Sequence, residues 1–346
     1  MIKRILEISR EPSHLAVRDA QLLILRKQDQ PRSLPAHPPN LAGSVPLEDV
    51  GVVVVDEDST TYSHRALSEI AAHGAAVIIC GRDHLPVGVL LPISEHTEVV
   101  WRQDDQISVG LPVKKRLWQR IIRAKIRAQS AALIPDESGR AARLALDRIA
   151  SDVTSGDSEN CEAQAARVYW GVWLGDAAAE SQARFRRDAT PGVHAAAPNC
   201  FLNYGYALIR AATARALVGA GLLPSLGIKH RHRSNAFCLA DDLMEPLRPL
   251  VDTVARDLFL AGERHLSQQN KARLLLLLTA STQSDGPSGV EHRTGPLMVA
   301  LHLYAASFAK ALAVRDAAVL SIPVPVPDHR PPLRCPPDPE SDPELD

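Results

Sequence analysis

The chain has 346 residues, 45% of them hydrophobic and 23% charged, which is typical of a soluble globular protein with one large domain or two. Its five cysteines include no CxxC pair, which argues for a reducing compartment and against a disulfide framework or structural zinc. The net charge of −1 argues against a nucleic-acid partner, but the segment Ser321–Asp346 holds six acids and two bases, so the remainder carries a positive excess.

The N-terminal residues predict no export and no membrane insertion. The start, MIKRILEIS, lacks the apolar stretch of a signal peptide. The purely apolar runs, such as Leu274–Leu278, are far too short to span a bilayer. We therefore expect a cytoplasmic protein without a membrane partner.

Short apolar runs between polar or proline breaks predict a β-rich domain over residues 1–95. One helix, over Ser63–His73, is expected within it. The predicted strands are Arg4–Ile8, Leu15–Val17, Leu22–Leu25, Val52–Val55 and Ala75–Cys80.

Longer helical periods follow and predict a larger, mostly α-helical domain over residues 96–320. The expected helices are Val113–Leu133, Gly139–Ile149, Glu162–Trp173, Asn203–Val218, Leu247–Phe259, Ser267–Ala280 and Gly295–Val314. Nine of the 26 prolines follow Ile322, so we expect residues 321–346 to form a disordered acidic tail. The predicted fold class is α+β, with a small N-terminal β-domain before a larger, mostly α-helical domain.

A basic helix is predicted between Asp105 and Asp136, a stretch without a single acid. Seven lysines and arginines fall within residues 114–127. Four of them recur at helical spacing and form one stripe: Arg116, Arg120, Arg123 and Arg127. A solvated helix face usually alternates positive and negative charges, so this stripe favours binding to backbone phosphates.

A second basic stretch, GIKHRHRSNAFCLADDLMEP at Gly227–Pro246, contains two histidines and further candidates for DNA contact: Lys229, Arg231 and Arg233. Because Pro246 lacks a backbone donor, a helix containing it is expected to begin only a few residues earlier. Asp242 would then be its N-cap and Glu245 its N3 residue, as in a capping box. The same geometry would instead offer both carboxylates to a ligand beside His230.

The residues alone leave two interpretations open for these groups. Glu162, which opens EAQAARVYWGVWLG, is equally consistent with a first-turn glutamate facing the helix dipole. A histidine combined with two or three carboxylates is, however, a mixed nitrogen and oxygen ligand set. That set suits Mg²⁺ or Mn²⁺ better than structural zinc.

The block Asn199–Asp252 resembles the universal CRISPR-associated integrase/endonuclease, the catalytic subunit of the spacer-acquisition complex. The matching pieces are LNYGY, GLLPSLGIKH and DLMEPLRPLVD. Upstream, GDSENCEAQAARVYW resembles the family segment with the first metal-binding glutamate. LWQRIIRAKIRAQ at Leu117–Gln129 resembles the branch of type II systems, which accompanies single-protein RNA-guided effectors. The resemblance extends over about residues 1–320.

The resemblance implies a catalytic metal site in which Glu162, His230 and Glu245 hold Mg²⁺ or Mn²⁺, with Asp242 as an optional fourth ligand. His232 and Asp241 are extra candidates for the histidine and the aspartate. A shared ion requires the ligating atoms to lie within about 5 Å of one another.

The resemblance also implies a reaction and partners. The family joins 3′-hydroxyl ends of a short double-stranded DNA to CRISPR repeat DNA by transesterification, so no protein nucleophile is needed. It forms homodimers, and two dimers clamp a dimer of a small ferredoxin-like adaptation partner in a four-to-two complex. The RNA-guided effector nuclease is a further candidate partner.

Two other functions compete with this hypothesis. A non-catalytic DNA-binding scaffold would need the basic surfaces but not the metal ligands. A small-molecule metallohydrolase would be expected to have more histidines at its metal and no long arginine stripe.

Overall fold

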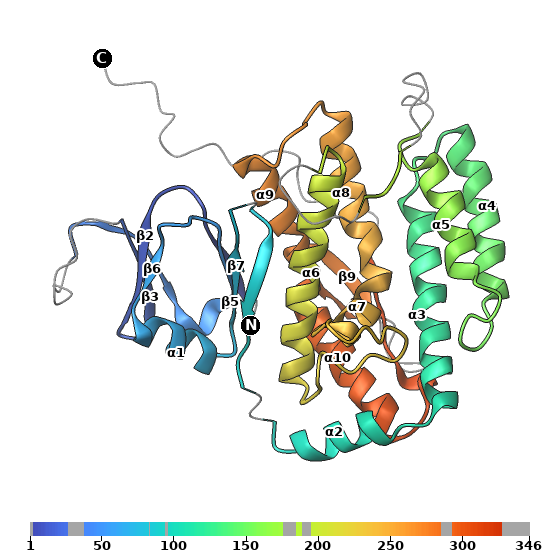
Figure 1. Ribbon diagram of the computed structural model, residues 1–346, viewed down its shortest axis with the longest axis horizontal. Helices are drawn as coiled ribbons and strands as arrows, with labels where there is room; N and C mark the ends of the chain where they lie inside the picture. Colours follow the sequence, from blue (N-terminus) through green and yellow to red (C-terminus); the bar gives the residue numbers. More distant parts are fainter. Residues whose placement is uncertain are drawn as a thin grey trace.

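The computed structural model describes residues 3–26, 38–82, 84–93, 96–175, 185–188, 195–284 and 293–326. It has the predicted α+β architecture, with a β-rich N-terminal domain at the left of Figure 1 and a larger, mostly helical domain at the right. Within the described part of the chain, no helix is both long and apolar enough to cross a membrane.

Two four-stranded sheets form the N-terminal domain. The first has the order β1-β5-β7-β8 and contains β1 (Arg4–Ile8), β5 (Val50–Val55), β7 (Ala76–Cys80) and β8 (Pro86–Leu90). The second has the order β4-β3-β2-β6 and contains β2 (Ser13–Arg18), β3 (Gln21–Arg26), β4 (Leu41–Pro46) and β6 (Thr61–Tyr62). The predicted helix is α1 (His64–Ala72), capped by the Ser63 side chain.

The position of strand β5 between two cores explains why its residues are apolar at consecutive positions. Neighbouring side chains of a strand point to opposite faces. Val53 and Val55 pack into the core of the N-terminal domain, whereas Val52 and Val54 pack into the core of the helical domain. Both faces are therefore buried, and no alternation with polar residues remains.

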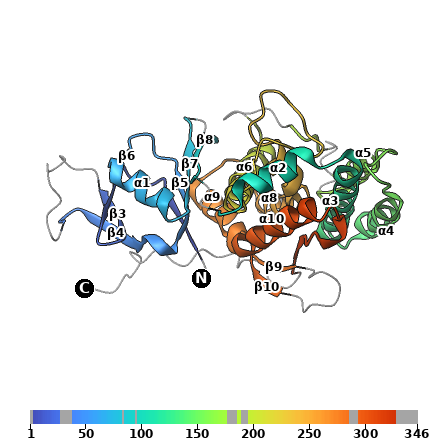
Figure 2. The same cartoon turned by 90° about the horizontal axis from the view of Figure 1, so that it is seen from below.

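In the described part of the helical domain, the seven predicted helices are joined by two further ones. Its helices are α2 (Val99–Ser108), α3 (Leu111–Ala132), α4 (Glu137–Asp152), α5 (Cys161–Val172), α6 (Asn199–Gly219), α7 (Cys238–Met244), α8 (Arg248–Leu260), α9 (Gln268–Leu275) and α10 (Leu297–Ala313). Helix α2 was not predicted because Gln106 is its only buried residue, so it carries no apolar period. It lies at the bottom of the helical domain in Figure 1, crosses in front of other helices in Figure 2, and leaves Trp101 exposed.

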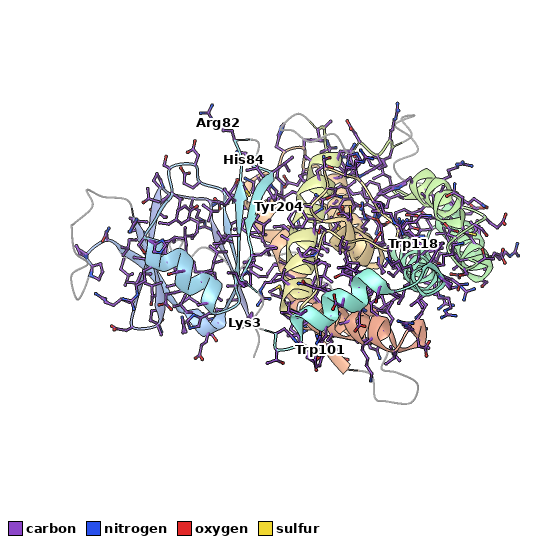
Figure 3. The ribbon with its side chains drawn as sticks, turned by 60° about the horizontal axis from the view of Figure 1, so that its bottom comes forward. Lys3, Arg82, His84, Trp101, Trp118 and Tyr204 are labelled. Atoms are coloured by element: carbon purple, nitrogen blue, oxygen red, sulfur yellow. The ribbon has the colours of Figure 1, made fainter. Side chains whose placement is uncertain are left out.

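Helix α6 is the centre of the helical domain. It contacts α7, α8, α9 and α10, and also β7 and β8 of the N-terminal domain. Tyr204 of α6 lies at the junction of the two domains (Figure 3). A helix surrounded in this way must be apolar or small on all sides, as the sequence of α6 is.

The beginning of the predicted tail is folded, which corrects the boundary at residue 321. Pro323–Pro325 forms β11, which pairs with β9 (Ser281–Ser284) beside β10 (Arg293–Pro296). Prolines fit here because β11 is an edge strand and needs no donors on its outer side. Residues 327–346, the rest of the predicted tail, lie outside the described residues.

The close packing of α6 against α8 requires a residue without a side chain at Gly205. A Cβ atom at Gly205 would lie 2.4 Å from Cγ1 of Val251, closer than any stable contact. We expect Gly205→Ala to lower the free energy of unfolding by about 1–3 kcal/mol, measured by urea titration. Gly171→Ala is the matched control: a Cβ there meets nothing within 4 Å, so it should stabilise the helix slightly. Equal effects of the two substitutions would contradict this packing argument.

Candidate metal and nucleic-acid site

Glu162 is positioned by the loop that precedes α5. The backbone N–H groups of Cys161 and Glu162 donate to Oδ1 and Oδ2 of the buried Asp157, at 2.7 and 3.1 Å. Asp157 thus satisfies the first donors of the helix and fixes where it begins. Glu162 is left in the first turn with 26% of its side chain exposed.

Glu245 lies at a break between two helices, so the predicted capping box is wrong. Helix α7 already begins at Cys238, which places Asp242 inside the helix rather than at its N-cap. Glu245 begins the short 3-10 turn Glu245–Leu247, in which Pro246 occupies an early position that needs no donor. The break turns the Glu245 side chain into the interior, where only 4% of it is exposed.

Asp242 organises the arm that carries His230. Its buried carboxylate accepts backbone hydrogen bonds from Ile228, Lys229 and His230, at 2.7, 3.0 and 3.1 Å. Its Oδ1 also lies 2.6 Å from Nδ1 of His230. Four partners saturate a carboxylate, so Asp242 supports the histidine and is not available as the optional fourth metal ligand.

The His230 ring is fixed from two sides. Asp242 holds Nδ1, and the ring stands perpendicular to the buried indole of Trp118 at 5.9 Å. The hydrogen bond to Asp242 raises the pKa of His230 above its ordinary value, although burial acts in the opposite direction. Among the described residues, Nε2 has no hydrogen-bond partner. A carboxylate on one imidazole nitrogen and an accessible second nitrogen is the arrangement of metal-binding histidines.

The two candidate glutamates meet at Lys125 of α3. Its Nζ atom donates to Oε1 of Glu162 at 2.6 Å and lies 2.6 Å from Oε2 of Glu245. Arg248 holds the other oxygen of Glu245 at 3.0 Å. Burial opposes ionisation of Glu245, but the charges of Arg248 and Lys125 outweigh it and lower the pKa of the carboxyl. Glu245 is therefore an anion at neutral pH.

A second buried network lies behind Arg248. Tyr169 and Tyr206 both donate to the carboxyl group of Asp252. Burial raises the pKa of Asp252 to about 6, in spite of these hydrogen bonds. The guanidinium of Arg248 lies over the Tyr206 ring, 4.9 Å from its centroid. This contact joins the LNYGY and DLMEPLRPLVD motifs beneath the candidate site.

The predicted ligands are brought together only in part. Glu162 and Glu245 share one cation, but in the described part of the chain no three histidine, cysteine or acidic side chains are close enough to hold an ion. Lys125 stands between the carboxylates, and His230 forms its own pair with Asp242. The negative charge of Glu245 nevertheless contributes to the raised pKa of His230, so the two are electrostatic neighbours.

The two extra candidates are engaged elsewhere. His232 is exposed, and its Nδ1 lies 2.9 Å from the Ser234 hydroxyl. Asp241 accepts from Arg210 and from Asn235, both at 2.7 Å. Between the two histidines, the geometry therefore favours His230.

The arginine stripe of α3 is not a free surface. Arg120 donates to the carbonyl of Leu320 at 2.9 Å, and Arg123 donates to the carbonyl of Val153 at 2.8 Å, where α4 has ended. Arg116 reaches the carbonyl of Arg315 at 3.4 Å. Carbonyl groups at helix ends thus supply negative partial charge, which offsets much of the repulsion among the arginines of the stripe. Arg116 and Arg127 are exposed and remain open to phosphates.

The second basic segment is exposed as predicted. Lys229, Arg231 and Arg233 all lie on the surface of the arm around His230. Lys229 also lies over the Trp118 ring, 5.8 Å from its centroid. Any anion held by these side chains would be a direct neighbour of the candidate metal ligands.

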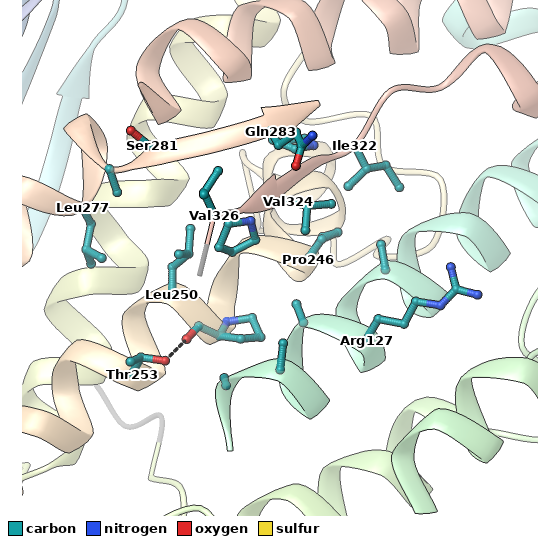
Figure 4. Close-up of a pocket in the computed structure, with 18 of the residues that line it drawn as sticks. Arg127, Pro246, Leu250, Thr253, Leu277, Ser281, Gln283, Ile322, Val324 and Val326 are labelled. Carbon is teal, nitrogen blue, oxygen red and sulfur yellow. Dashed lines mark hydrogen bonds between the residues drawn. The ribbon is translucent and has the colours of Figure 1, made fainter. Parts of the chain in front are cut away.

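A cavity of about 620 Å³ lies along the other flank of α3 (Figure 4). Its walls come from α3, α8, β9 and β11, with Leu250, Val324 and Val326 among its apolar side chains. Arg120, Arg123 and Arg127 line its edge. The cavity is mainly apolar and none of its lining residues is a carboxylate, so it is separate from the candidate metal site.

Lys125 was missed as a site residue, although its spacing carried a signal. Trp118, Ile122, Lys125 and Gln129 recur at intervals of four, three and four residues, which is the spacing of a buried helix face. A lysine on such a face is almost always paired. Asp157 gave no comparable signal, because its role depends on the path of the loop around it.

Residues 6–283 match the family described as CRISPR associated protein Cas1. The chain is 35% identical over 281 residues to a CRISPR-associated endonuclease Cas1 of Neisseria meningitidis, covering 81% of this chain and 86% of the relative. The protein therefore belongs to the Cas1 family.

Two solved structures share the fold at low sequence identity. A casposase bound to integration product superposes with a TM-score of 0.67 at 18% identity, over 91% of this chain and 93% of that one. The chain of a Cas6-RT-Cas1–Cas2 complex superposes with a TM-score of 0.66 at 18% identity, over 92% of this chain and 36% of that longer one. These similarities establish the arrangement of the domains.

Proposed function

We propose that this protein is a metal-dependent DNA integrase and endonuclease of CRISPR adaptation, which joins 3′-hydroxyl ends of short DNA to the CRISPR repeat. The observation that carries the proposal is the meeting of Glu162 and Glu245 at one buried cation, next to an imidazole that Asp242 orients. Family membership and the endonuclease name of the Neisseria relative support it.

The donor atoms fit Mg²⁺ or Mn²⁺. Oε2 of Glu245 is buried, and the Lys125 ammonium lies 2.6 Å from it. A buried carboxylate oxygen that already faces a cation is a natural ligand for a hard metal ion. Glu162, Glu245 and Nε2 of His230 would hold the ion. When bound, it would lower the pKa of the attacking DNA hydroxyl and offset charge at the phosphorus atom.

The chain itself supplies positioning and charge. Asp242 fixes the tautomer and direction of His230, and Arg248 keeps Glu245 anionic. The exposed arm of Lys229, Arg231 and Arg233 would bind the DNA backbone beside the reacting phosphate. Positioning and electrostatics of this kind supply most of the catalysis in phosphoryl transfer, where the nucleophile belongs to the substrate.

We further propose the partners that the family resemblance implies. They are a second copy of this chain, double-stranded DNA with 3′-hydroxyl ends, CRISPR repeat DNA, and a Cas2-type ferredoxin-like protein in a four-to-two complex. The similarity to a chain of a Cas1–Cas2 complex supports the last of these. We propose the cytoplasm as its location.

An integration assay tests the proposal. The protein, its genomic Cas2-type partner, short duplex DNA and the repeat are incubated with Mg²⁺, Mn²⁺ or a chelator. We expect covalent joining of the 3′ ends to the repeat only with the metal. DNA binding without joining would instead support the non-catalytic scaffold. Hydrolysis of small phosphoesters without DNA binding would support a metallohydrolase.

Arg231 offers a test of the DNA-binding arm. Because a phosphate contact releases counterions, Arg231→Ala should weaken binding to all DNA sequences alike and reduce the salt slope of log K by about one. Fluorescence anisotropy at several salt concentrations measures both quantities. Arg148→Ala, on an exposed position of the outer helix α4, is the control and should leave the slope unchanged. An unchanged slope in Arg231→Ala would show that the arm faces something other than DNA.

A further inference from the structure

Lys125 is a buried cation placed where the proposed function, on which this inference rests, requires a metal ion. Only 12% of its side chain is exposed, on a buried face of α3 that also carries Trp118, Ile122 and Gln129. Its ammonium touches one oxygen of Glu162 and one of Glu245, each at 2.6 Å. The two carboxylate oxygens are thus no farther apart than twice that distance, and they face the same cation.

The ion pairs define the charge state of this cluster. Nζ of Lys125 donates to Oε1 of Glu162 and pairs with Oε2 of Glu245, which are the contacts of an ammonium between two carboxylates. With Arg248 on the far oxygen of Glu245, the cluster contains two cations and two carboxylates, and its charges balance.

A divalent cation cannot join this balanced cluster without a change. An ammonium and a doubly charged ion that share the same two oxygens would repel each other strongly in a buried site. Arg248 is held over the Tyr206 ring and faces the other oxygen, so it has little reason to move. The lysine, on a flexible four-carbon stem, is the cation that can leave.

We propose that Lys125 is an exchangeable counter-ion, which holds Glu162 and Glu245 together in the metal-free protein and competes with the divalent cation for their oxygens. It keeps two buried carboxylates from repelling each other until the metal arrives. Once displaced, its ammonium remains in the site as a positive charge for a substrate phosphate. The substitution of this side chain should therefore change metal affinity in the absence of DNA.

The test is a titration with Mn²⁺ in the absence of DNA. Isothermal calorimetry measures the heat of binding, and electron paramagnetic resonance measures the concentration of free Mn²⁺. Lys125→Met keeps the length of the side chain and removes its charge. We expect Lys125→Met to bind Mn²⁺ at least about ten-fold more tightly than wild type, because the competing charge is gone. Mn²⁺ should also raise its melting temperature more than that of wild type.

Two further variants separate charge from packing. Lys125→Arg keeps the positive charge and should bind Mn²⁺ no more tightly than wild type. It provides a second measurement if Lys125→Met folds poorly. Lys115→Met, at an exposed position of the same helix, should leave Mn²⁺ affinity unchanged. Tighter binding by Lys125→Arg as well would overturn the proposal, because size rather than charge would then control affinity.

The outcomes distinguish this inference from the proposed function. If wild type binds Mn²⁺ and Lys125→Met binds it equally or more weakly, Lys125 is a structural ion-pair partner and only this inference fails. If neither protein binds Mn²⁺, the metal site itself fails and the proposed function with it. If Lys125→Met binds Mn²⁺ tightly and wild type does not, both the metal site and this inference are supported, because removal of the Lys125 charge then allows the ion to bind.

Discussion

Glu162→Gln is expected to abolish DNA integration while the protein stays folded. The substitution keeps the shape of the side chain but removes the charge through which Glu162 would bind the metal. Loss of a group that merely supports a metal ligand costs 10–100-fold in activity as a rule, so loss of a ligand should exceed roughly 100-fold. Gel analysis of labelled DNA joined to the repeat measures this loss directly.

The control for this experiment is Glu159→Gln, which removes an exposed carboxylate just before α5. It should integrate DNA like wild type. Circular dichroism and the melting temperature check that both variants are folded, since the Asp157 cap that begins α5 remains in each. Normal integration by a folded Glu162→Gln variant would exclude Glu162 from the metal site.

Asp242→Ala should cause the largest loss of stability among the site residues. The substitution leaves three backbone N–H groups without an acceptor and frees the His230 ring. Each unsatisfied buried donor costs about 1–3 kcal/mol, and partial rearrangement of the arm would limit the total to roughly 3–5 kcal/mol. Urea unfolding followed by fluorescence measures this change.

Asp241→Ala is the neighbouring control: Asp241 accepts from the half-exposed Arg210 and from Asn235, two side chains that can turn to water, so its loss should cost less, about 1–2 kcal/mol. A second measurement follows His230 by NMR. Since the hydrogen bond to Asp242 raises the pKa of His230, Asp242→Ala should return that pKa toward its ordinary value of about 6.5. Equal stability losses in both variants, or an unchanged His230 titration, would contradict the supporting role of Asp242.

The sequence predicted those features that depend on local pattern. Strand β5 is a continuous apolar run and helix α3 carries apolar residues at helix spacing, so their positions followed from these local patterns. Helix α7 did not follow, because Pro246 suggested a single helix beginning near Asp242 where the structure has two helices and a break. A proline marks where a helix can begin, but not whether another helix ends beside it.

The candidate site was predictable as a set of residue types but not as an arrangement. The resemblance named Glu162, His230 and Glu245, and the structure places the two glutamates at Lys125. The hydrogen-bond partners of Asp242 and of the arginine stripe lie on loops that come from distant parts of the chain. Arg120, for instance, donates to Leu320, two hundred positions away, which no local spacing could indicate.

The position of β5 between two cores has a consequence for how this protein can be divided. Val52 and Val54 on one face belong to the helical domain, while Val53 and Val55 on the other belong to the sheet domain. A fragment ending near residue 95 would expose one complete face of its central strand, with Ile78 of β7 beside it. The N-terminal domain is therefore not a transferable module, and fusions or chimaeras built at that boundary should aggregate unless the helical domain comes with it.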